Sequence, residues 1–290
     1  MVEFFQHCLN ALILGGTYAL LGIGLTLIFG IMKVVNFTHG ELYTFGAYMV
    51  FFFVMVVGAN FFVAIIISMV LGIVLGALIE FVLLRPLRGA NIDTTMLVMI
   101  GAWITLQNLE QFTWSGIAKS VNHPFPVEPL VLGSVSVSWL RIFVFLFALT
   151  LIGGTYFLIN RTKLGKAMRA TFQDQDTAAL MGVNINGIYT ATFALGSSLA
   201  AAAGALLGPV FIVTPYMGDM AALKAFAIVI LGGLGNIIGA TIGGFVLALV
   251  EELGAGYISS GYRDAMGFLL IIIVLVYKPT GLFAVKEGIG

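Results

Sequence analysis

The sequence predicts an all-α, polytopic integral membrane protein, and three observations support that fold class. Hydrophobic residues make up 60% of the 290-residue chain and charged residues only 9%, whereas soluble domains carry about 25% charge. The mean hydropathy is +1.10. Apolar windows of about 20 residues, the length that a helix needs to cross a bilayer, recur along the chain. We therefore expect one domain, residues 1–290, embedded in the lipid bilayer.

The windows predict roughly eight to nine transmembrane helices. They cover residues 9–31, 42–58, 61–84, 94–114, 141–159, 186–208, 222–235, 236–252 and 263–277. The count depends on whether 222–252 holds two spans or a re-entrant pair. No Lys or Arg precedes the first window, which argues against a cleaved signal peptide, so we expect this window to be retained.

The first interruption between windows, Ile31–Glu41, is polar and leaves no room for an ordinary loop. Irregular polar backbone at membrane depth is tolerated where it is buried in protein or lines a wet cavity, and transporters use such broken helices at their substrate sites. An inner turn that faces water is the alternative. The candidate pathway residues are Asn36, Thr38, His39, Gly40 and Glu41. For Glu41 we favour an ion pair with Lys33 over a contact with a substrate ammonium.

A second irregular segment lies in the other half of the chain. Pro209, Pro215, Gly218 and Asp219 break the pattern, and an apolar run then leads into a glycine-rich turn. Glycine permits close helix packing or a tight re-entrant turn. A broken segment in each half indicates a central pathway, although no repeat aligns between the halves. The turn adds three pathway candidates, Gly232, Gly233 and Gly235.

The segment 160–186 is the densest polar stretch of the chain. Arg161, Lys163, Lys166 and Arg169 fall within it, and Lys and Arg near span ends are retained on the cytoplasmic side. Counting outward from this loop places the N-terminus outside and the C-terminus inside. Four further basic residues then also lie inside: Arg85, Arg88, Lys278 and Lys286.

This cytoplasmic loop also has helical periodicity. Phe172, Ala179, Leu180 and Val183 recur at the spacing of one helix face, which predicts a short amphipathic helix between two spans. Asp174 or Asp176 is expected to cap its start, and Gly182 to end it in a left-handed turn.

Other features exclude several kinds of chemistry. The long outer loop 116–140 contains three prolines and predicts extended structure with a short hairpin. Four acids near span ends, Glu80, Glu110, Glu251 and Glu252, are interpreted as interfacial anchors. Cys8 is the only cysteine, so no cysteine metal cluster forms, and no metal site is expected. No GxxxxGK[ST] motif occurs, so the chain binds no nucleotide by a P-loop. We expect no catalytic residues, no cofactor and, at zero net charge, no nucleic acid partner.

Several motifs resemble the permease family of branched-chain amino acid ABC importers, in particular the first (H-type) of the paired permeases. The family pattern N-F-A-H-G-[DE]-L corresponds to Asn36–Leu42, with Thr38 in place of the usual Ala. The other matching stretches are Gly24–Gly30, Gly46–Tyr48, Met99–Trp103, Leu106–Asn108, Ala167–Ala170, Asp176–Gly182, Phe193–Gly196, Ala203–Gly204, Leu231–Asn236, Gly239 and Lys278–Leu282.

The resemblance implies a transport subunit in a bacterial inner membrane. Its partners would be a second permease subunit, two ABC ATPase subunits that bind ATP, and a periplasmic substrate-binding protein. The ATPase would dock on the cytoplasmic loop, which is similar to the E-A-A-x-x-x-G pattern of import permeases, with the acid displaced and the spacing one residue shorter. The implied docking residues are Asp174, Asp176, Thr177, Ala178, Ala179 and Gly182. A urea or short-amide ABC permease, an ion-coupled secondary carrier and a channel remain alternatives.

Overall fold

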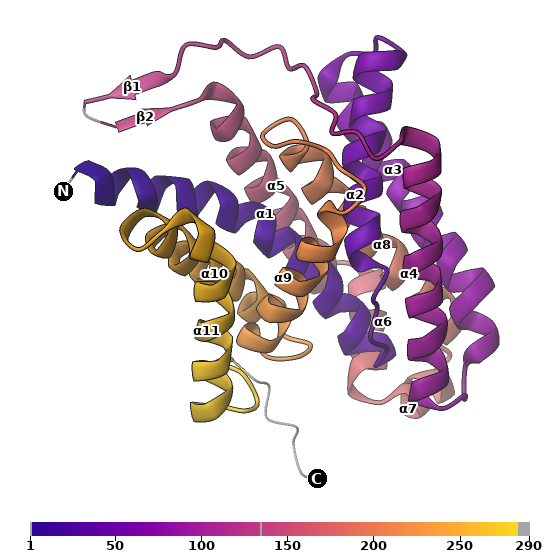
Figure 1. Ribbon diagram of the computed structural model, residues 1–290. Coiled ribbons are helices and arrows are strands. Elements are labelled where there is room, and N and C mark those ends of the chain that lie inside the picture. The colour runs from indigo at the N-terminus through magenta and orange to yellow at the C-terminus, as the bar shows by residue number, and fades with distance from the viewer. Residues whose placement is uncertain (1, 134, 284–290) are drawn as a thin grey trace.

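The computed structural model describes residues 2–133 and 135–283, and it is almost entirely helical (Figure 1). Its α-helices are α1 (Val2–Met32), α2 (His39–Phe51), α3 (Phe61–Ile79), α4 (Ile92–Trp114), α5 (Trp139–Arg161), α6 (Lys163–Gln173), α7 (Gln175–Leu180), α8 (Ile185–Leu207), α9 (Met217–Gly232), α10 (Ile237–Tyr257) and α11 (Arg263–Tyr277). Short π-helical turns extend α2 (Phe52–Val56) and α3 (Glu80–Leu84), and 3₁₀ turns cover Arg85–Leu87 and Ser260–Tyr262. Lys286 lies outside the described residues.

The all-α polytopic fold class is confirmed. Seven helical segments of the described chain are long and apolar enough to cross a membrane. They correspond to α1, α2, α3, α5, α8, α10 and α11 with their short extensions. The other long helices are α4, which has 23 residues, and α9, which has 16.

The segment 222–252 holds two separate helices joined by a tight turn. α9 has 16 residues, so it rises about 24 Å, less than the roughly 30 Å hydrocarbon core of a bilayer. The chain before α9 is not helical, and Val213 within it pairs with Lys119 of the outer loop through two 2.9 Å backbone hydrogen bonds. α9 begins beside the start of α2, where the buried Gly218 packs on Gly40.

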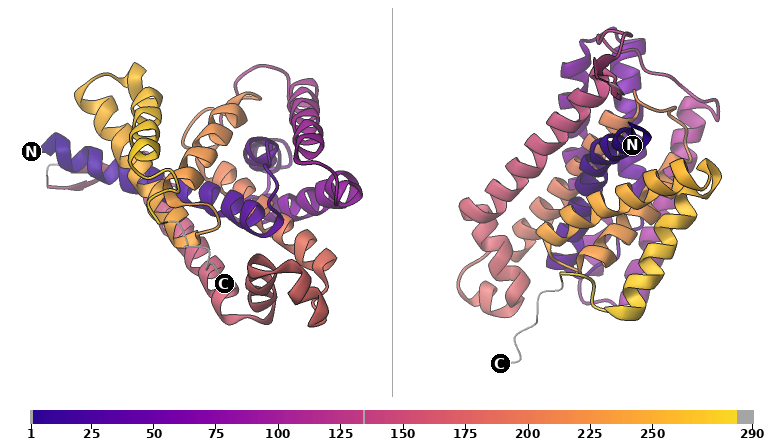
Figure 2. Two further views of the ribbon diagram at one scale, coloured as in Figure 1. Left: turned by 90° about the horizontal axis from the view of Figure 1, so that it is seen from below. Right: turned by 90° about the vertical axis from the view of Figure 1, so that its left-hand side faces the viewer.

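α1 and α8 form the centre of the bundle. Of their most apolar windows, 89% and 83% of the residues are buried, against 17% for α5 and for α11. Peripheral helices that expose apolar side chains are suited to lipid contact. Figure 2 shows the long, tilted α1 crossing the whole bundle.

Glycines let the central helices approach each other closely. A side chain on Gly24 of α1 would meet the Gly196 carbonyl oxygen at 2.7 Å, and one on Gly196 of α8 would meet the Gly24 oxygen at 2.7 Å. Met32 and Tyr189 line the same pocket, so α1 ends where α8 begins and the two helices are antiparallel. The close contact is therefore reciprocal between these two central helices.

Polar contacts repeat the same relation. Tyr18 of α1 donates to Glu251 of α10 at 2.8 Å, and Thr190 of α8 donates to Glu80, just after α3, at 2.6 Å. Glu80, just after α3, also pairs with Arg88, and Glu252 of α10 pairs with Arg263. Each arginine follows its acid in the chain. In each half of the chain, an acid thus bonds to the central helix of the other half, Glu251 to α1 and Glu80 to α8.

The hairpin that was predicted in the loop 116–140 is present. β1 (Leu130–Leu132) pairs antiparallel with β2 (Val135–Val137). The Gln6 side chain of α1 donates to the Ser136 carbonyl at 2.9 Å and accepts from its N–H at 3.0 Å. Figures 1 and 2 show the hairpin at the end of the bundle opposite to α6 and α7.

Candidate functional site

The break between α1 and α2 is packed inside the protein. Asn36 Oδ1 accepts from the Thr38 N–H at 3.0 Å and from its hydroxyl at 2.5 Å. His39 Nε2 lies 3.0 Å from the Leu21 carbonyl oxygen of α1. All three side chains are fully buried. The alternative of an inner turn facing water is therefore wrong, and these residues hold the broken backbone in place.

The break brings the starts of two helices together. A side chain on Gly40 would overlap the Gly218 carbonyl oxygen, and one on Gly218 would meet the Gly40 oxygen at 2.7 Å. Gly40 belongs to the first turn of α2 and Gly218 to the first turn of α9. The glycines thus permit backbone contact where these two short helices begin.

Each of these glycines precedes an acid, Glu41 on α2 and Asp219 on α9. Glu41 is 0% exposed, and its Oε1 lies against the backbone of Gly218. Lys33 is exposed, and no ion pair joins it to Glu41 within the described residues. The favoured pairing of Glu41 with Lys33 was therefore wrong.

One face of α4 covers Glu41. Trp103, Gln107 and Glu110 recur at i, i+4 and i+7, and Trp103 and Glu110 are neighbours of the Glu41 carboxyl. Gln107 Nε2 donates to Asp219 Oδ1 at 2.8 Å, which links α4 to α9. We call Glu41, Glu110 and Asp219 the acidic junction.

The sequence did not single out Glu110 and Asp219 as site residues. The interpretation of Glu110 as an interfacial anchor was wrong, because this residue is buried. The other three presumed anchors, Glu80, Glu251 and Glu252, are buried too and form ion pairs. The available signal was the Gly-acid pair that occurs once in each broken segment, Gly40-Glu41 and Gly218-Asp219.

The glycine turn joins α9 to α10. Gly233 and Gly235 have φ values of +88° and +81°, a backbone region that favours glycine. The backbone of Gly232 packs directly on Gly239 of α10, and the Leu282 N–H donates to the Leu231 carbonyl at 2.8 Å. The structure thus places these three pathway candidates in a packed corner, and their role in the pathway stays a prediction.

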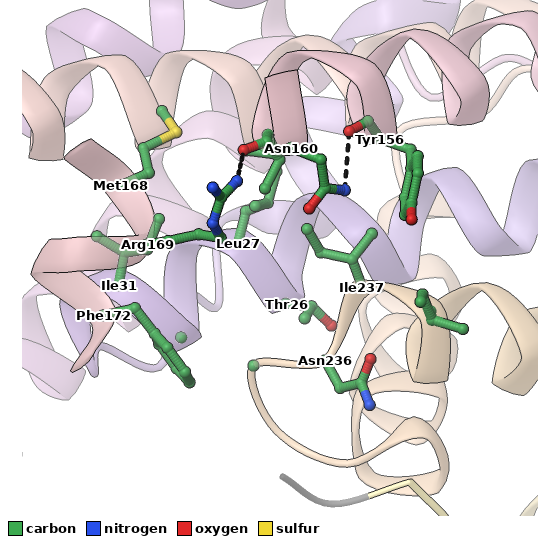
Figure 3. Close-up of a pocket in the computed structure, with 14 residues that line it drawn as sticks. Thr26, Leu27, Ile31, Tyr156, Asn160, Met168, Arg169, Phe172, Asn236 and Ile237 are labelled. Carbon is green, nitrogen blue, oxygen red and sulfur yellow. Dashed lines mark hydrogen bonds between the residues drawn. The ribbon is translucent and has the colours of Figure 1, made fainter. Parts of the chain in front are cut away.

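A cavity of about 240 Å³ lies beside this turn (Figure 3). Phe172 of α6 reaches toward Gly235, where it and Gly30 of α1 leave no space for a larger residue. Arg169 of α6 donates to the Ile159 carbonyl of α5 at the other side of the cavity. Through Phe172, α6 therefore packs against both the glycine turn and α1.

The predicted single helix in the loop 160–186 is two helices, which corrects that expectation. Asp174 has an extended backbone, with φ −155° and ψ 111°, and separates α6 from α7. Phe172 lies on α6, whereas Ala179 and Leu180 lie on α7, so the predicted apolar face does not exist. The buried residues of this pair of helices are Gly165, Met168, Thr171 and Ala178.

The predicted helix signals at both ends of α7 are confirmed. Asp174 caps α7: its carboxyl accepts from the Thr177 N–H at 2.9 Å and from the Thr177 hydroxyl at 2.8 Å. The hydrogen bond from the Thr177 backbone N–H, and then that from its hydroxyl, lower the pKa of the Asp174 carboxyl from its ordinary value. Gly182 follows α7 with φ +85°. Asp176 is exposed and does not cap the helix.

The tip of this hairpin exposes apolar side chains. Leu180 is 88% exposed and Met181 is 81% exposed, next to the exposed Ala179. They lie at the C-terminal end of α7, and Figure 1 shows α7 at the end of the bundle opposite to β1 and β2. We call Leu180 and Met181 the apolar tip of the α6–α7 hairpin.

Membrane-length apolar helices around broken segments that carry buried polar residues are typical of integral membrane transport proteins. The chain belongs to the family described as branched-chain amino acid transport system / permease component, whose model matches residues 7–275. The expected family membership is therefore confirmed.

Named relatives cover nearly the whole chain. The high-affinity branched-chain amino acid transport system permease protein BraD of Pseudomonas aeruginosa is 34% identical over 98% of this chain and 97% of its own length. The corresponding LivH protein of Escherichia coli K12 is 34% identical over 98% and 96%. A probable LivH of Methanocaldococcus jannaschii is 29% identical over 95% and 91%. No solved structure matches the chain.

Proposed function

We propose that this chain is the transmembrane permease subunit of an ATP-binding cassette importer for branched-chain or other hydrophobic amino acids. The family match over residues 7–275 carries this proposal. It supports the importer over a urea or short-amide permease and over an ion-coupled carrier or channel. The subunit performs no covalent chemistry, and ATP is bound by its partners.

The importer pairs this subunit with a second permease, two ATPase subunits and a periplasmic substrate-binding protein, in the bacterial inner membrane. The N-terminus faces the periplasm and the C-terminus the cytoplasm. The ATPase docks on the α6–α7 hairpin, where the apolar tip has no cover within the described chain. An exposed apolar tip rimmed by polar residues is typical of a protein contact.

The structure supplies a route by which ATPase movement reaches the pathway. A displacement of α7 is transmitted to α6, and Phe172 of α6 presses on Gly235 at the glycine turn. That turn fixes the end of α9, whose start borders Glu41. The ATPase shifts the equilibrium between outward-open and inward-open states because its contacts with the hairpin differ in the two states.

The proposed orientation predicts opposite labelling of two engineered cysteines in a Cys8→Ser background. Lys166→Cys in α6 should react with an impermeant thiol reagent only from the cytoplasm, because the basic residues of this loop are retained there. Ser120→Cys in the outer loop should react only from the periplasm. Labelling of position 166 in cells that have a permeabilised outer membrane and an intact inner membrane would contradict the orientation.

The proposed function predicts ATP-driven leucine uptake by vesicles that contain the assembled importer and the liganded binding protein. Leucine should accumulate only when ATP is present on the hairpin side, and collapse of proton and sodium gradients should leave the initial rate unchanged. Vesicles that contain a hydrolysis-deficient ATPase are the matched control. Accumulation driven by an ion gradient, without ATPase subunits, would contradict the proposal and favour a secondary carrier.

A further inference from the structure

We propose that the acidic junction, Glu41, Glu110 and Asp219, receives the ammonium group of the amino acid as it crosses the membrane. This inference rests on the proposed function and assigns the substrate contact within it. Three helices supply the carboxyl groups: α2, α4 and α9. Figure 1 shows α2 between α9 and α4, with both helices within reach of it.

The first observation is that two of these carboxyl groups are buried without sufficient partners. Glu41 is 0% exposed and Glu110 is 7% exposed. Neither oxygen of Glu41, nor Oε2 of Glu110, has a hydrogen-bond partner of standard geometry among the described residues, and the two carboxyl groups lie beside each other. Acids inside a membrane protein are costly unless they are paired with a cation, so two adjacent buried acids in no ion pair among the described residues indicate a function.

The other buried acids of the membrane helices are different. Glu251 lies 2.8 Å from Lys224 Nζ, and Glu252 lies 2.5 Å from Arg263. Glu80 is paired with Arg88. No ion pair within residues 2–133 and 135–283 includes a member of the acidic junction. The fold therefore supplies a cation to each of the other buried acids and leaves the junction to be completed by a cation from outside.

A second, independent observation is a polar group beside the junction. Tyr48 is fully buried, it lies on α2 seven residues after Glu41 and so on the same face, and its hydroxyl is within electrostatic range of Glu110. Within the described residues the Tyr48 hydroxyl has no partner. Its ring stacks on Trp114 of α4, with centroids 5.6 Å apart. Carboxyl oxygens and aromatic rings together form a suitable environment for an organic ammonium group.

The chemistry of the junction favours an ammonium group over a metal ion. Among the described residues, no three His, Cys, Asp or Glu side chains are grouped closely enough to hold a metal. An ammonium group carries its own hydrogen-bond donors, so it can bind one or two of these carboxyl groups at a time as it moves along the path. Asp219 is only partly buried, so it is the member of the junction that an incoming substrate meets first.

The test compares Glu41→Gln with Glu80→Gln in the reconstituted importer. The amide introduced by Glu41→Gln can donate to Glu110, so the thermal midpoint of this variant should equal or exceed that of the unmodified importer. Leucine uptake should nevertheless fall about tenfold or more, because a hydrogen bond to a charged group is lost during transport. Glu80→Gln leaves Arg88 without its partner and should lower the midpoint. If Glu41 had a purely structural role, Glu41→Gln would instead lower the thermal midpoint.

Asp219→Asn provides a second variant that does not depend on buried packing. Asparagine retains the acceptor for Gln107 and removes only the charge, so assembly should be normal and leucine uptake should fall several-fold. Wild-type uptake by both Glu41→Gln and Asp219→Asn would overturn the inference while leaving the importer function intact. Uptake that collapses when choline replaces sodium would assign the junction to a metal cation and would also overturn it. Absence of uptake by the unmodified importer would instead refute the proposed function.

Discussion

Replacing Gly204 with valine is expected to prevent the bundle from forming. A side chain at this position of α8 would overlap the Tyr43 carbonyl oxygen, and its Cβ would lie 2.7 Å from the Tyr43 carbonyl carbon and 3.2 Å from the Ala47 nitrogen. These are backbone atoms of α2, which is itself held against α9, so they have no room to retreat. Overpacking of a core usually costs about 1 to 3 kcal/mol, and a backbone collision belongs at or above the upper end of that range.

The measurement is the yield of monodisperse protein in detergent, with its thermal midpoint. Gly154→Val is the matched control, because a Cβ added at Gly154 of α5 would have no other atom within 4 Å. The control should insert and elute normally, because valine has a slightly higher helix propensity than glycine and meets no other atom there. Equal yields and midpoints for Gly204→Val and Gly154→Val would show that α2 and α8 are not packed as described.

In the proposed importer, replacing Gly182 with valine should uncouple leucine uptake from ATP hydrolysis while leaving the permease in the membrane. Gly182 has φ +85° and open space around it, so the effect comes from the backbone alone. A β-branched residue is strained in this conformation by about 1 kcal/mol or more. The end of α7 then rearranges, and the apolar tip changes its position. We expect leucine uptake to fall about tenfold, the factor that about 1.4 kcal/mol represents.

Gly182→Asn is the matched control, since asparagine enters the left-handed region more readily than any β-branched residue. It should retain most of the uptake and should still carry the ATPase through purification, whereas Gly182→Val should lose both. Normal uptake and ATPase association in Gly182→Val would remove the hypothesis that the α6–α7 hairpin docks the ATPase.

The positions of the membrane helices could be predicted because a long apolar run has one stable solution in lipid. The windows 61–84, 94–114 and 141–159 coincide closely with α3, α4 and α5 and their extensions. The positive φ of Gly182 could also be predicted, since glycine after a short helix indicates a left-handed end.

The partners of the polar residues could not be predicted, because they come from distant parts of the chain. Glu41 has its neighbours on α4 and α9, roughly 70 and 180 residues further along. Lys33 is close in sequence, but its backbone has φ +54° and its side chain is exposed. The division into α6 and α7 was missed because periodicity over Phe172–Val183 does not reveal the extended residue Asp174 near its start.

In the proposed importer, the coupling to ATP depends on the contact of the apolar tip with an ATPase subunit, and this contact can be measured directly. A photoreactive amino acid at Leu180, which is 88% exposed, should cross-link to the ATPase in the assembled importer. The same residue at Val127, which is 93% exposed in the segment between α4 and β1, should not. A cross-link from position 127 and none from position 180 would contradict both the docking surface and the orientation.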